Sequence, residues 1–410
     1  MDSITRLIVS LDWGDEQQEV GELVFQDRKI FYKYYPDFID YGLEISPFKL
    51  PLSQEILQPD TMVFDGLFGV FFDSLPDGWG RLLIDRMLIS RGIGLDSISA
   101  LDRLAIVGKD GMGSLSYKPA KGPVEKISLN YDLDEIAEAS RRIYEGESSK
   151  LLDHLVEIGG SSGGARPKIF VGYNSGSDQL IYGETKLPKG FEDWIIKFPS
   201  SSDPEDIAMI EFSYYKMALE AGLEMSECRL FRGASGRFYF GTKRFDRFNG
   251  HRRHLHSASG LLHDNFRLSN LDYGHLMDAA FRLENSVEAY QKVLRLAAFN
   301  VFSHNRDDHS KNFSFLMDKK GTWKLAPVYD LTFSYSSHGF HSTTVNGEGK
   351  NPGSKQLLEL ADIFGLKDGK KIIEQVKESI VQWGEFANET GVGSSSKKQI
   401  SIALNKLIKE

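Results

Sequence analysis

A buried helix that runs straight into a segment dense in charge constrains this chain more than any other feature of its sequence. Residues 287–303 carry apolar side chains on most faces, which is typical of a helix inside a core. The segment that follows, residues 305–312, reads Asn-Arg-Asp-Asp-His-Ser-Lys-Asn. Burying such charge is costly unless the groups are paired or have a chemical role. The fold must therefore bring these side chains to a cleft or to buried partners.

The spacing inside this segment indicates phosphoryl transfer. Four residues separate Asp307 from Asn312, as in the catalytic loop of kinases. In that loop the Asp accepts the proton of the attacking hydroxyl, and the Asn oxygen coordinates a divalent cation. We therefore predict Asp307 as catalytic base and Asn312 as metal ligand. Lys311 and His309 would stabilise the transferring phosphoryl group.

A second carboxylate follows a short predicted hairpin formed by residues 313–317 and 322–325. Asp330, in Pro-Val-Tyr-Asp, is predicted to hold Mg²⁺ between phosphate oxygens, with Leu331 and Thr332 in place of the kinase Phe-Gly. Mg²⁺ prefers oxygen ligands and keeps several waters. Asn312 and Asp330, together with a nucleotide, would therefore suffice to bind it.

A strand lysine and a helix glutamate complete the kinase pattern. Lys197 ends an apolar strand predicted over 193–198, and would hold the α- and β-phosphates. Glu211, on the next helix, would orient it. We expect that helix to have Asp203 as N-cap, Pro204 in its first turn and Gly222 past its end.

The loop at residues 159–164, Gly-Gly-Ser-Ser-Gly-Gly, is the candidate phosphate cover. Glycines let backbone N–H groups approach phosphate oxygens closely. No Gly-Lys-Ser/Thr closes the loop, so it is not a Walker A motif. Its serines, Ser161 and Ser162, are candidate phosphorylation sites.

Each feature alone has an ordinary explanation. Asp-x-x-x-x-Asn pairs occur in capping turns, a lysine ends many solvated strands, and Gly/Ser loops are usually flexible connectors. Their order along the chain (Gly loop, strand Lys, helix Glu, Asp-x-x-x-x-Asn, hairpin, Asp) favours phosphotransfer.

A basic and histidine-rich stretch, residues 243–256, surrounds Asn249-Gly250, which predicts a hairpin. We expect its arginines and histidines to lie on a solvated surface, because no oriented carboxylate is evident beside them. Contact with an acidic partner or RNA is a second hypothesis.

Strand-like runs open the chain and helical patterns dominate its last third, which predicts an α+β, two-lobed fold with a β-rich N-terminal subdomain and an all-α C-terminal lobe. Boundaries are expected at 1–121, 122–248 and 249–410, with Gly122-Pro123 marking the first. The net charge is −9, and the single cysteine, Cys228, excludes an internal disulfide. No apolar run approaches the length of a membrane span, so we expect a cytoplasmic protein with no membrane partner.

At this point the chain resembles the HipA-type serine/threonine kinases, the toxin halves of bacterial type II toxin–antitoxin modules. The resemblance rests on motifs spread along nearly the whole chain. These are 75–81 (Leu-Pro-Asp-Gly-Trp-Gly-Arg), 111–115 (Gly-Met-Gly-Ser-Leu), 163–168 (Gly-Gly-Ala-Arg-Pro-Lys), 243–247 (Lys-Arg-Phe-Asp-Arg), 307–312 and 327–330.

The resemblance implies a protein-kinase-like fold that uses ATP and Mg²⁺ to phosphorylate a serine or threonine of a protein. It implies ATP contacts in the regulatory Gly-rich loop (Gly163, Gly164, Lys168) and in the hinge region (Lys243, Phe245). It also implies autophosphorylation of the loop at Ser161, with Ser162 as second choice. Arg166-Pro167 replaces the Gln-Glu of the best-known toxin of the family, a change that would restrict the loop.

The resemblance further implies partners. Known targets in the family are aminoacyl-tRNA synthetases, whose inhibition halts translation and favours dormancy and persistence. A small HipB-like helix-turn-helix antitoxin usually binds the toxin and, through operator DNA, represses the operon. An acidic chain beside a basic DNA-binding partner is electrostatically sensible.

Two other functions stay open from the residues. A small-molecule kinase of the aminoglycoside- or choline-kinase type would share the Asp-x-x-x-x-Asn chemistry but would not need the region before Gly122. A catalytically silent corepressor scaffold would not need the set Lys197, Asp307, Asn312 and Asp330.

Overall fold

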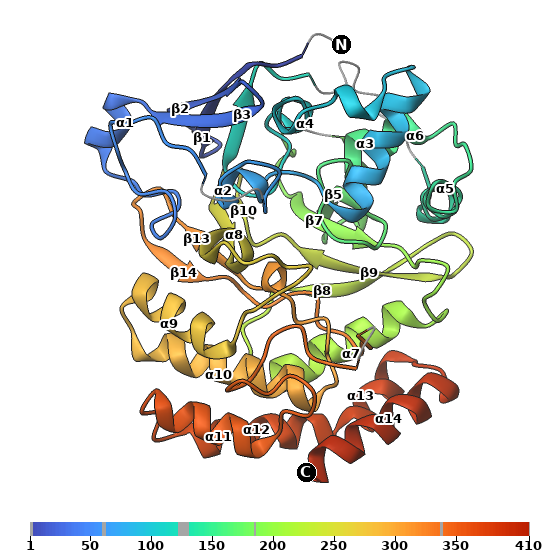
Figure 1. The fold of residues 1–410 in the computed structure, drawn as a ribbon. Helices are drawn as coiled ribbons and strands as arrows, with labels where there is room; N and C mark the ends of the chain where they lie inside the picture. The colour runs from blue at the N-terminus through green and yellow to red at the C-terminus, as the bar shows by residue number, and fades with distance from the viewer. Residues whose placement is uncertain (1–2, 60–62, 122–130, 184–185, 337–338, 410) are drawn as a thin grey trace.

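Two larger antiparallel sheets, a small three-stranded sheet and a layer of C-terminal helices make up the molecule (Figure 1). The computed structural model describes residues 3–59, 63–121, 131–183, 186–336 and 339–409. The mixture of helix and sheet confirms the predicted α+β class. In the view of Figure 1 the N-terminal elements lie at the top, the five-stranded sheet lies across the middle, and the last helices form the base.

The N-terminal sheet has the order β3-β2-β1-β4. Its strands are β1 (Arg6–Asp12), β2 (Gln17–Gln26), β3 (Lys29–Tyr34) and β4 (Leu115–Lys118). Leu7, Val9 and Leu11 alternate along β1 and are fully buried, because successive strand side chains point to opposite faces. This sheet confirms the predicted β-rich start of the chain.

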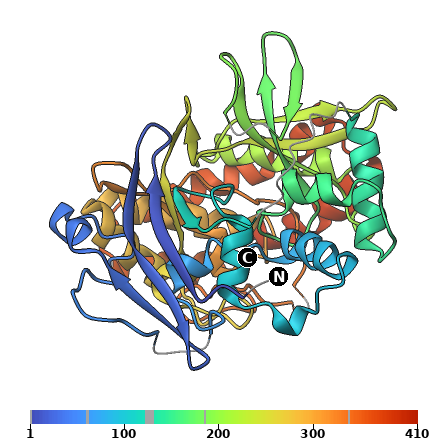
Figure 2. The ribbon, with the colours of Figure 1, turned by 90° about the horizontal axis from the view of Figure 1, so that it is seen from above.

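The second sheet has five antiparallel strands in the order β6-β5-β7-β9-β8, and Figure 2 shows it beside the N-terminal sheet, over the C-terminal helices. The strands are β5 (Lys168–Asn174), β6 (Gln179–Tyr182), β7 (Glu192–Lys197), β8 (Cys228–Arg232) and β9 (Phe238–Lys243). Trp194 and Ile196 point into the core from β7. Helix α7 (Ile207–Glu220) packs against β8 and β9, so the strand that ends at Lys197 lies beside the helix that carries Glu211.

The start of α7 differs from the prediction. Asp206 occupies the N-cap position, and Asp203 instead accepts hydrogen bonds from the backbone N–H of Ser200, at 2.9 Å, and from Arg166. Asp203 is therefore drawn into a turn and an ion pair, which compete with helix capping for the same oxygens. The predicted end is confirmed, since Gly222 follows α7 with φ +79°.

Other helices cover the N-terminal and five-stranded sheets. They are α1 (Pro36–Tyr41), α2 (Gly69–Phe72), α3 (Gly78–Ser90), α4 (Ala100–Val107), α5 (Leu133–Tyr144) and α6 (Leu152–Gly159), with a 3₁₀ turn over Leu95–Ser97. Trp79 on α3 is fully buried in one core with α5, α6 and the five-stranded sheet. The chain before residue 121 therefore shares a core with the chain after it, and the domain boundaries remain predictions. Gly122-Pro123 lies outside the described residues.

The C-terminal layer is helical, as predicted. It contains α9 (Tyr273–Glu284), α10 (Val287–Phe302), α11 (Ser354–Ile363), α12 (Gly369–Val381), α13 (Trp383–Thr390) and α14 (Ser394–Lys409). Helix α8 (Ala258–Leu262) lies apart from this layer and packs against α2. Helices α12 and α13 meet at Gln382, where Trp383 is buried against Tyr214 of α7. Gly384 directly follows Trp383, and glycine weakens a helix, so the break also has a local signal in the sequence. Among the described residues, no helix is both long and apolar enough to cross a membrane.

The predicted hairpin after the charged segment is present as β13 (Ser314–Met317) and β14 (Trp323–Leu325), and β12 (His254–Ser257) adds a third strand. A second hairpin, β10 (Arg247–Phe248) and β11 (His251–Arg252), turns at Asn249-Gly250, where both residues have positive φ.

The prediction of a solvated surface for residues 243–256 is confirmed for His251 and Arg253, which are exposed, and wrong for Arg244, His254 and His256. His254 and His256 are fully buried and Arg244 is 7% exposed. Arg244 donates to both oxygens of buried Asp246, at 2.9 and 2.8 Å. His256 Nδ1 lies 2.7 Å from Asp73 Oδ2. Burial of these groups requires polar partners, which are Asp246 inside the stretch and Asp73, far away in the sequence.

Candidate active site

A cleft of about 490 Å³ opens between the Gly-rich loop, the five-stranded sheet and the segment that follows α10. It gathers nearly every residue that the sequence analysis selected. The lining includes Ser161, Ser162, Gly163, Gly164, Lys168, Lys197, Lys243, Phe245, Asp307, His309, Lys311, Asn312 and Asp330. Glu211 is not in this lining, but it contacts Lys197 from behind.

The catalytic segment leaves α10 and is held at its backbone. The N–H groups of Arg306 and Asp307 donate to Ser334 Oγ at 3.0 and 3.1 Å. Asn312 Nδ2 donates to the carbonyl oxygen of Asp307 at 2.7 Å, so its side-chain oxygen is the atom that would serve a cation. His309 Nε2 lies 3.9 Å from Asp307 Oδ1. The Asp307 side chain is 63% exposed and is therefore accessible to a substrate.

Asp308 is a residue that sequence reasoning missed. Its side chain is fully buried, and its carboxylate accepts hydrogen bonds from Tyr273 Oη (2.9 Å), the Ser342 N–H (2.8 Å) and the Thr343 N–H (3.3 Å). His341 Nδ1 lies 3.0 Å from the same carboxylate. Asp308 therefore ties the catalytic segment to residues 341–343, while its neighbour Asp307 faces the cleft.

Lys197 lies between two carboxylates. Its Nζ is 2.6 Å from Asp330 Oδ1 and 3.1 Å from Glu211 Oε2. Burial opposes the charge on Lys197, but Asp330 and Glu211 outweigh it and raise the pKa of Lys197. Lys197 likewise is the main cause that holds the pKa of Asp330 well below its usual range. Asp330 has φ +57°, a conformation that non-glycine residues rarely adopt and that is often found at functional sites.

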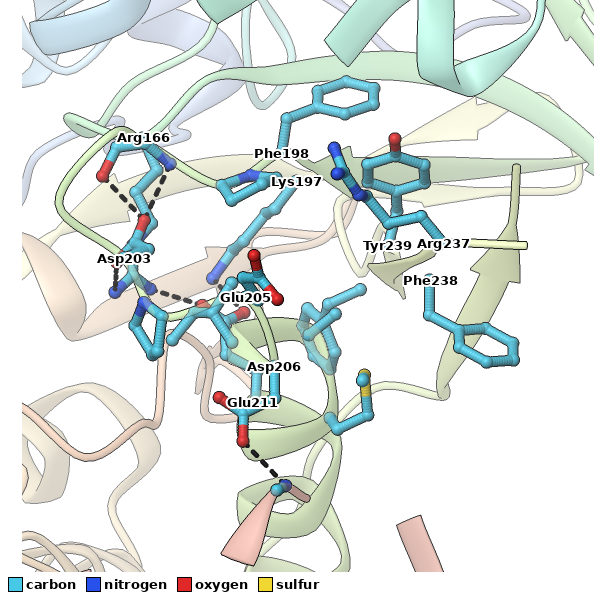
Figure 3. Close-up of a pocket in the computed structure, with 18 of the residues that line it drawn as sticks. Arg166, Lys197, Phe198, Asp203, Glu205, Asp206, Glu211, Arg237, Phe238 and Tyr239 are labelled. Atoms are coloured by element: carbon cyan, nitrogen blue, oxygen red, sulfur yellow. Dashed lines mark hydrogen bonds and ion pairs between the residues drawn. The ribbon is translucent and has the colours of Figure 1, made fainter. Parts of the chain in front are cut away.

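Glu211 also binds Arg166, which follows the Gly-rich loop. Arg166 Nη1 contacts Glu211 Oε1, and Arg166 Nη2 contacts Asp203 Oδ1 at 2.8 Å. Figure 3 shows Arg166 beside Asp203, with Lys197 and Glu211 nearby, among the residues that line a second cavity. The end of the Gly-rich loop is thereby linked to the α7 carboxylate that contacts Lys197.

The Gly-rich loop closes one side of the cleft. Ser161 Oγ donates to the carbonyl oxygen of Asp110 at 2.7 Å and is partly exposed, whereas Ser162 is buried and donates to the carbonyl oxygen of Gly159 at 2.6 Å. Lys168 Nζ donates to the Gly163 carbonyl oxygen at 2.6 Å. Burial, with repulsion from Lys197, lowers the pKa of Lys168.

The hinge region starts where β9 ends, at the end of the five-stranded sheet opposite to Lys197. Lys243 pairs with Glu192, and the ring of Phe245 lies 5.5 Å from that of Tyr329. Both Lys243 and Phe245 line the cleft, which gives an aromatic surface at its edge.

The donor set suits a hard cation that keeps much of its water. Asn312 and Asp330 offer oxygen atoms to one cleft, which matches the preference of Mg²⁺ for oxygen ligands. Across the described ranges, no group of three or more His, Cys, Asp or Glu side chains is arranged to hold a metal by itself. A cation bound here would therefore depend on oxygen atoms of a nucleotide as well.

Two models of known protein families match this chain. The family model described as the HipA-like C-terminal domain matches residues 160–384, which is more than half of the chain. The chain belongs to the HipA family. The HipA N-terminal domain matches residues 13–118, so both parts of a HipA protein are represented.

Two curated proteins are similar to this chain at low identity. The putative kinase Y4mE of Sinorhizobium fredii is 28% identical over 244 residues, which cover 52% of this chain and 48% of Y4mE. This match therefore spans about half the length of that relative. The serine/threonine-protein kinase toxin HipA of Shewanella oneidensis is 25% identical over 358 residues, covering 81% of this chain and 76% of the relative.

A solved HipA structure has the same fold. HipA of Shewanella oneidensis, in a complex with HipB and operator DNA, aligns with a TM-score of 0.68 over 98% of this chain and 96% of that chain, at 20% identity. The fold is therefore the two-lobed, protein-kinase-like fold of HipA, as predicted.

Proposed function

We propose that this HipA-family chain is an ATP- and Mg²⁺-dependent serine/threonine protein kinase. The observation that carries the proposal is that one cleft is lined by Lys197, Asp307, Asn312 and Asp330. Lys197 and Asp330 are in contact there although their positions in the sequence differ by 133. A strand lysine, a helix carboxylate and two metal-binding side chains are the parts that kinases use to position ATP.

In this proposal the sheet holds the nucleotide. Lys197 would bind the α- and β-phosphates in place of its present contact with Asp330, and Glu211 would keep its side chain aligned. Backbone N–H groups of Gly163 and Gly164 and the Lys168 ammonium would contact phosphate oxygens. Phe245 and Lys243 would contact the base end of ATP.

Asp307 would accept the proton of the attacking serine or threonine hydroxyl, and Lys311 and His309 would stabilise charge on the phosphoryl group. Asn312 and Asp330 would hold Mg²⁺, which, when bound, neutralises charge on the phosphate oxygens. In these roles the more exposed carboxylate, Asp307, transfers the proton, and the less exposed one, Asp330, binds the metal.

Replacing Asp330 with Asn should lower the rate of phosphate transfer about 100-fold, because an anionic metal ligand contributes several kcal/mol. The Mg²⁺ concentration needed for half-maximal rate should rise. Initial rates across a Mg²⁺ titration measure both effects. Asp318→Asn, in the turn between β13 and β14, is the matched control and should keep the wild-type rate. An Asp330→Asn variant with unchanged Mg²⁺ dependence would remove Asp330 from the metal site.

The pH dependence of transfer should carry the signature of Asp307. Although 63% of the Asp307 side chain is exposed, the protein around it displaces part of its water and so raises its pKa. Asp330 and Asp308 raise this pKa further, and His309 opposes them. Because the base must be unprotonated, the rate should fall as pH drops through this raised pKa. His309→Ala removes an opposing positive charge and should move the acid limb to higher pH. A pH–rate profile checks this, and a limb that stays in place or moves to lower pH would contradict it.

The family context suggests the protein partners. The Shewanella oneidensis relative is named a toxin, and its structure contains HipB and operator DNA. We infer for this chain a HipB-like antitoxin, operator DNA contacted through it, and a protein substrate, with an aminoacyl-tRNA synthetase as the first to test. Ser161, the more accessible of the two loop serines, is the proposed autophosphorylation site, with Ser162 second.

Nucleotide binding and the choice of phosphate acceptor together separate this function from its alternatives. Mg-ATP should raise the melting temperature, because a ligand that binds only the folded state stabilises it. Transfer to a protein serine, and not to small hydroxyl compounds such as choline or an aminoglycoside, is the expected specificity. Transfer only to the small compounds would favour the small-molecule kinase, and no thermal shift at all would favour the silent scaffold.

A further inference from the structure

The N-terminal subdomain reaches into the cleft through one carboxylate. Asp77 immediately precedes α3, within the region that matches the HipA N-terminal domain, and lines the cleft beside Gly163, Gly164 and Lys311. It lies 234 residues before Lys311 in the sequence. The structure thus brings a residue from outside the predicted kinase lobes into contact with the proposed phosphate-binding groups.

The two oxygens of Asp77 have separate partners. Lys311 Nζ lies 2.6 Å from Oδ2, and the backbone N–H of Gly164 donates to Oδ1. Burial opposes a charge on Asp77, yet Lys311, the Gly164 N–H and Lys168 together lower the pKa of its carboxyl. The carboxylate is therefore kept ionised between the Gly-rich loop and the catalytic segment.

Asp77 does not serve the local role that its position suggests. It is the N-cap residue of α3, where an aspartate usually accepts a hydrogen bond from the first turn. Within the described residues of α3, no backbone N–H forms such a cap with its side chain. Both oxygens point away from their own helix and toward the site, which indicates a function beyond helix stability.

The surroundings of Asp77 fix it against the loop. The Trp79 N–H donates to the Gly164 carbonyl oxygen at 2.8 Å, and Trp79 Nε1 donates to the Lys168 carbonyl oxygen at 3.1 Å. Gly78 has φ +43°, and a Cβ at this position would collide with the Gly164 carbonyl group. The start of α3 therefore packs on the loop at backbone distance, and only glycine permits this approach.

Two aromatic rings also hold Lys311. Its Nζ lies 4.8 Å from the ring centroid of Phe72, also in the N-terminal subdomain, and 4.8 Å from that of Phe266. Two aromatic faces and one carboxylate leave a long, flexible side chain few other positions.

We propose that Asp77, a residue of the N-terminal subdomain, is a positioning residue for phosphotransfer. Its carboxylate holds the Lys311 ammonium and the Gly164 N–H at fixed positions relative to each other. The inference rests on the proposed function, because it assigns Lys311 and the loop to the phosphates. It makes the N-terminal subdomain a part of the active site of the kinase. A 1 Å displacement of such a group can cost a reaction about 100-fold.

A double-mutant cycle on the full chain tests this. Asp77→Asn should lower the single-turnover rate of phosphate transfer from Mg-ATP by about 10- to 100-fold. Lys311→Gln should lower it by a similar factor, and the double variant should lose little more than Lys311→Gln alone, because Asp77 acts through Lys311. Asp85→Asn is the matched control, since Asp85 lies on the same helix and pairs with Arg103 at 2.6 Å outside the cleft. It should lower the melting temperature but keep the transfer rate.

The outcomes separate this inference from the function on which it rests. A purely structural role would make the two losses multiply, and an Asp77→Asn rate equal to wild type would also overturn the inference while leaving the kinase intact. If Asp77→Asn does not fold, Asp77→Glu keeps the charge but displaces the carboxylate, and a wild-type rate in that variant would overturn it. A wild-type chain that transfers no phosphate would refute the proposed function and this inference together.

Discussion

Replacing Asp307 with Ala is expected to abolish phosphate transfer while the fold stays intact. A general base contributes about 100- to 10,000-fold to a rate, so the single-turnover rate from Mg-ATP should fall by that factor. The fold should survive because the Asp307 side chain is 63% exposed and its ion-pair partner, His309, lies 3.9 Å away. Substitutions at such sites change stability by about 0.5 kcal/mol or less.

Two controls accompany the Asp307→Ala measurement. The melting temperature should match that of the wild type, and Mg-ATP should still raise it, because Lys197, Asn312 and Asp330 remain in place. Transfer at the wild-type rate would show that another group removes the proton, and the assignment of the base would then be wrong.

Replacing the next residue, Asp308, with Ala is expected to have the opposite profile, with a large loss of stability. The change would leave the Tyr273 hydroxyl, two backbone N–H groups and His341 without their buried acceptor. Removing one partner from a buried polar network costs about 3–5 kcal/mol. Thermal unfolding should show a melting temperature lower by roughly 5 °C or more.

The two neighbouring aspartates serve as matched controls for each other. Asp307→Ala should cost activity without stability, and Asp308→Ala should cost stability first, with any loss of activity following from displaced residues 341–343. A melting temperature for Asp308→Ala within a degree of the wild type would show that these hydrogen bonds do not hold the segment in solution.

Local patterns explain why much of the fold and of the candidate site could be predicted. Helix α10 and the strands β13 and β14 lie within one residue of their predicted bounds, because helical spacing and turn residues are local signals. The spacing of Asp307 and Asn312, and the place of Asp330 after a hairpin, are likewise written in short stretches of sequence. These residues do line one cleft, although their chemical roles remain predictions.

What escaped prediction depends on contacts between distant segments. Nothing in the sequence near Asp77 marks its partner Lys311, and the partner of His256, Asp73, lies 183 residues away from it. The sequence Asp-Asp at 307–308 does not say which carboxylate is buried, because burial depends on the return of residues 341–343. Propensity and motif spacing carry no information on such pairings, which only tertiary packing creates.

Asp77 connects the N-terminal subdomain to the cleft. A small-molecule kinase would not need this region, yet here its helix α3 packs on the Gly-rich loop and shares a core with the five-stranded sheet. Arg166 joins the same loop to Glu211 from the other side. The loop is thus held between the N-terminal subdomain and α7, so a change at Ser161 or Ser162 would act on both.

In the proposed function, this cleft transfers phosphate from Mg-ATP to a serine hydroxyl. Peptide-mapping mass spectrometry of the purified chain after incubation with Mg-ATP tests it most directly, with the Asp307→Ala variant and a Mg²⁺-free sample beside it. We expect phosphate on Ser161 or Ser162 only in the wild type with Mg²⁺. The proposed function would be wrong if the wild-type chain gains no phosphate and shows no thermal shift with Mg-ATP, or if the Asp307→Ala variant gains as much phosphate as the wild type.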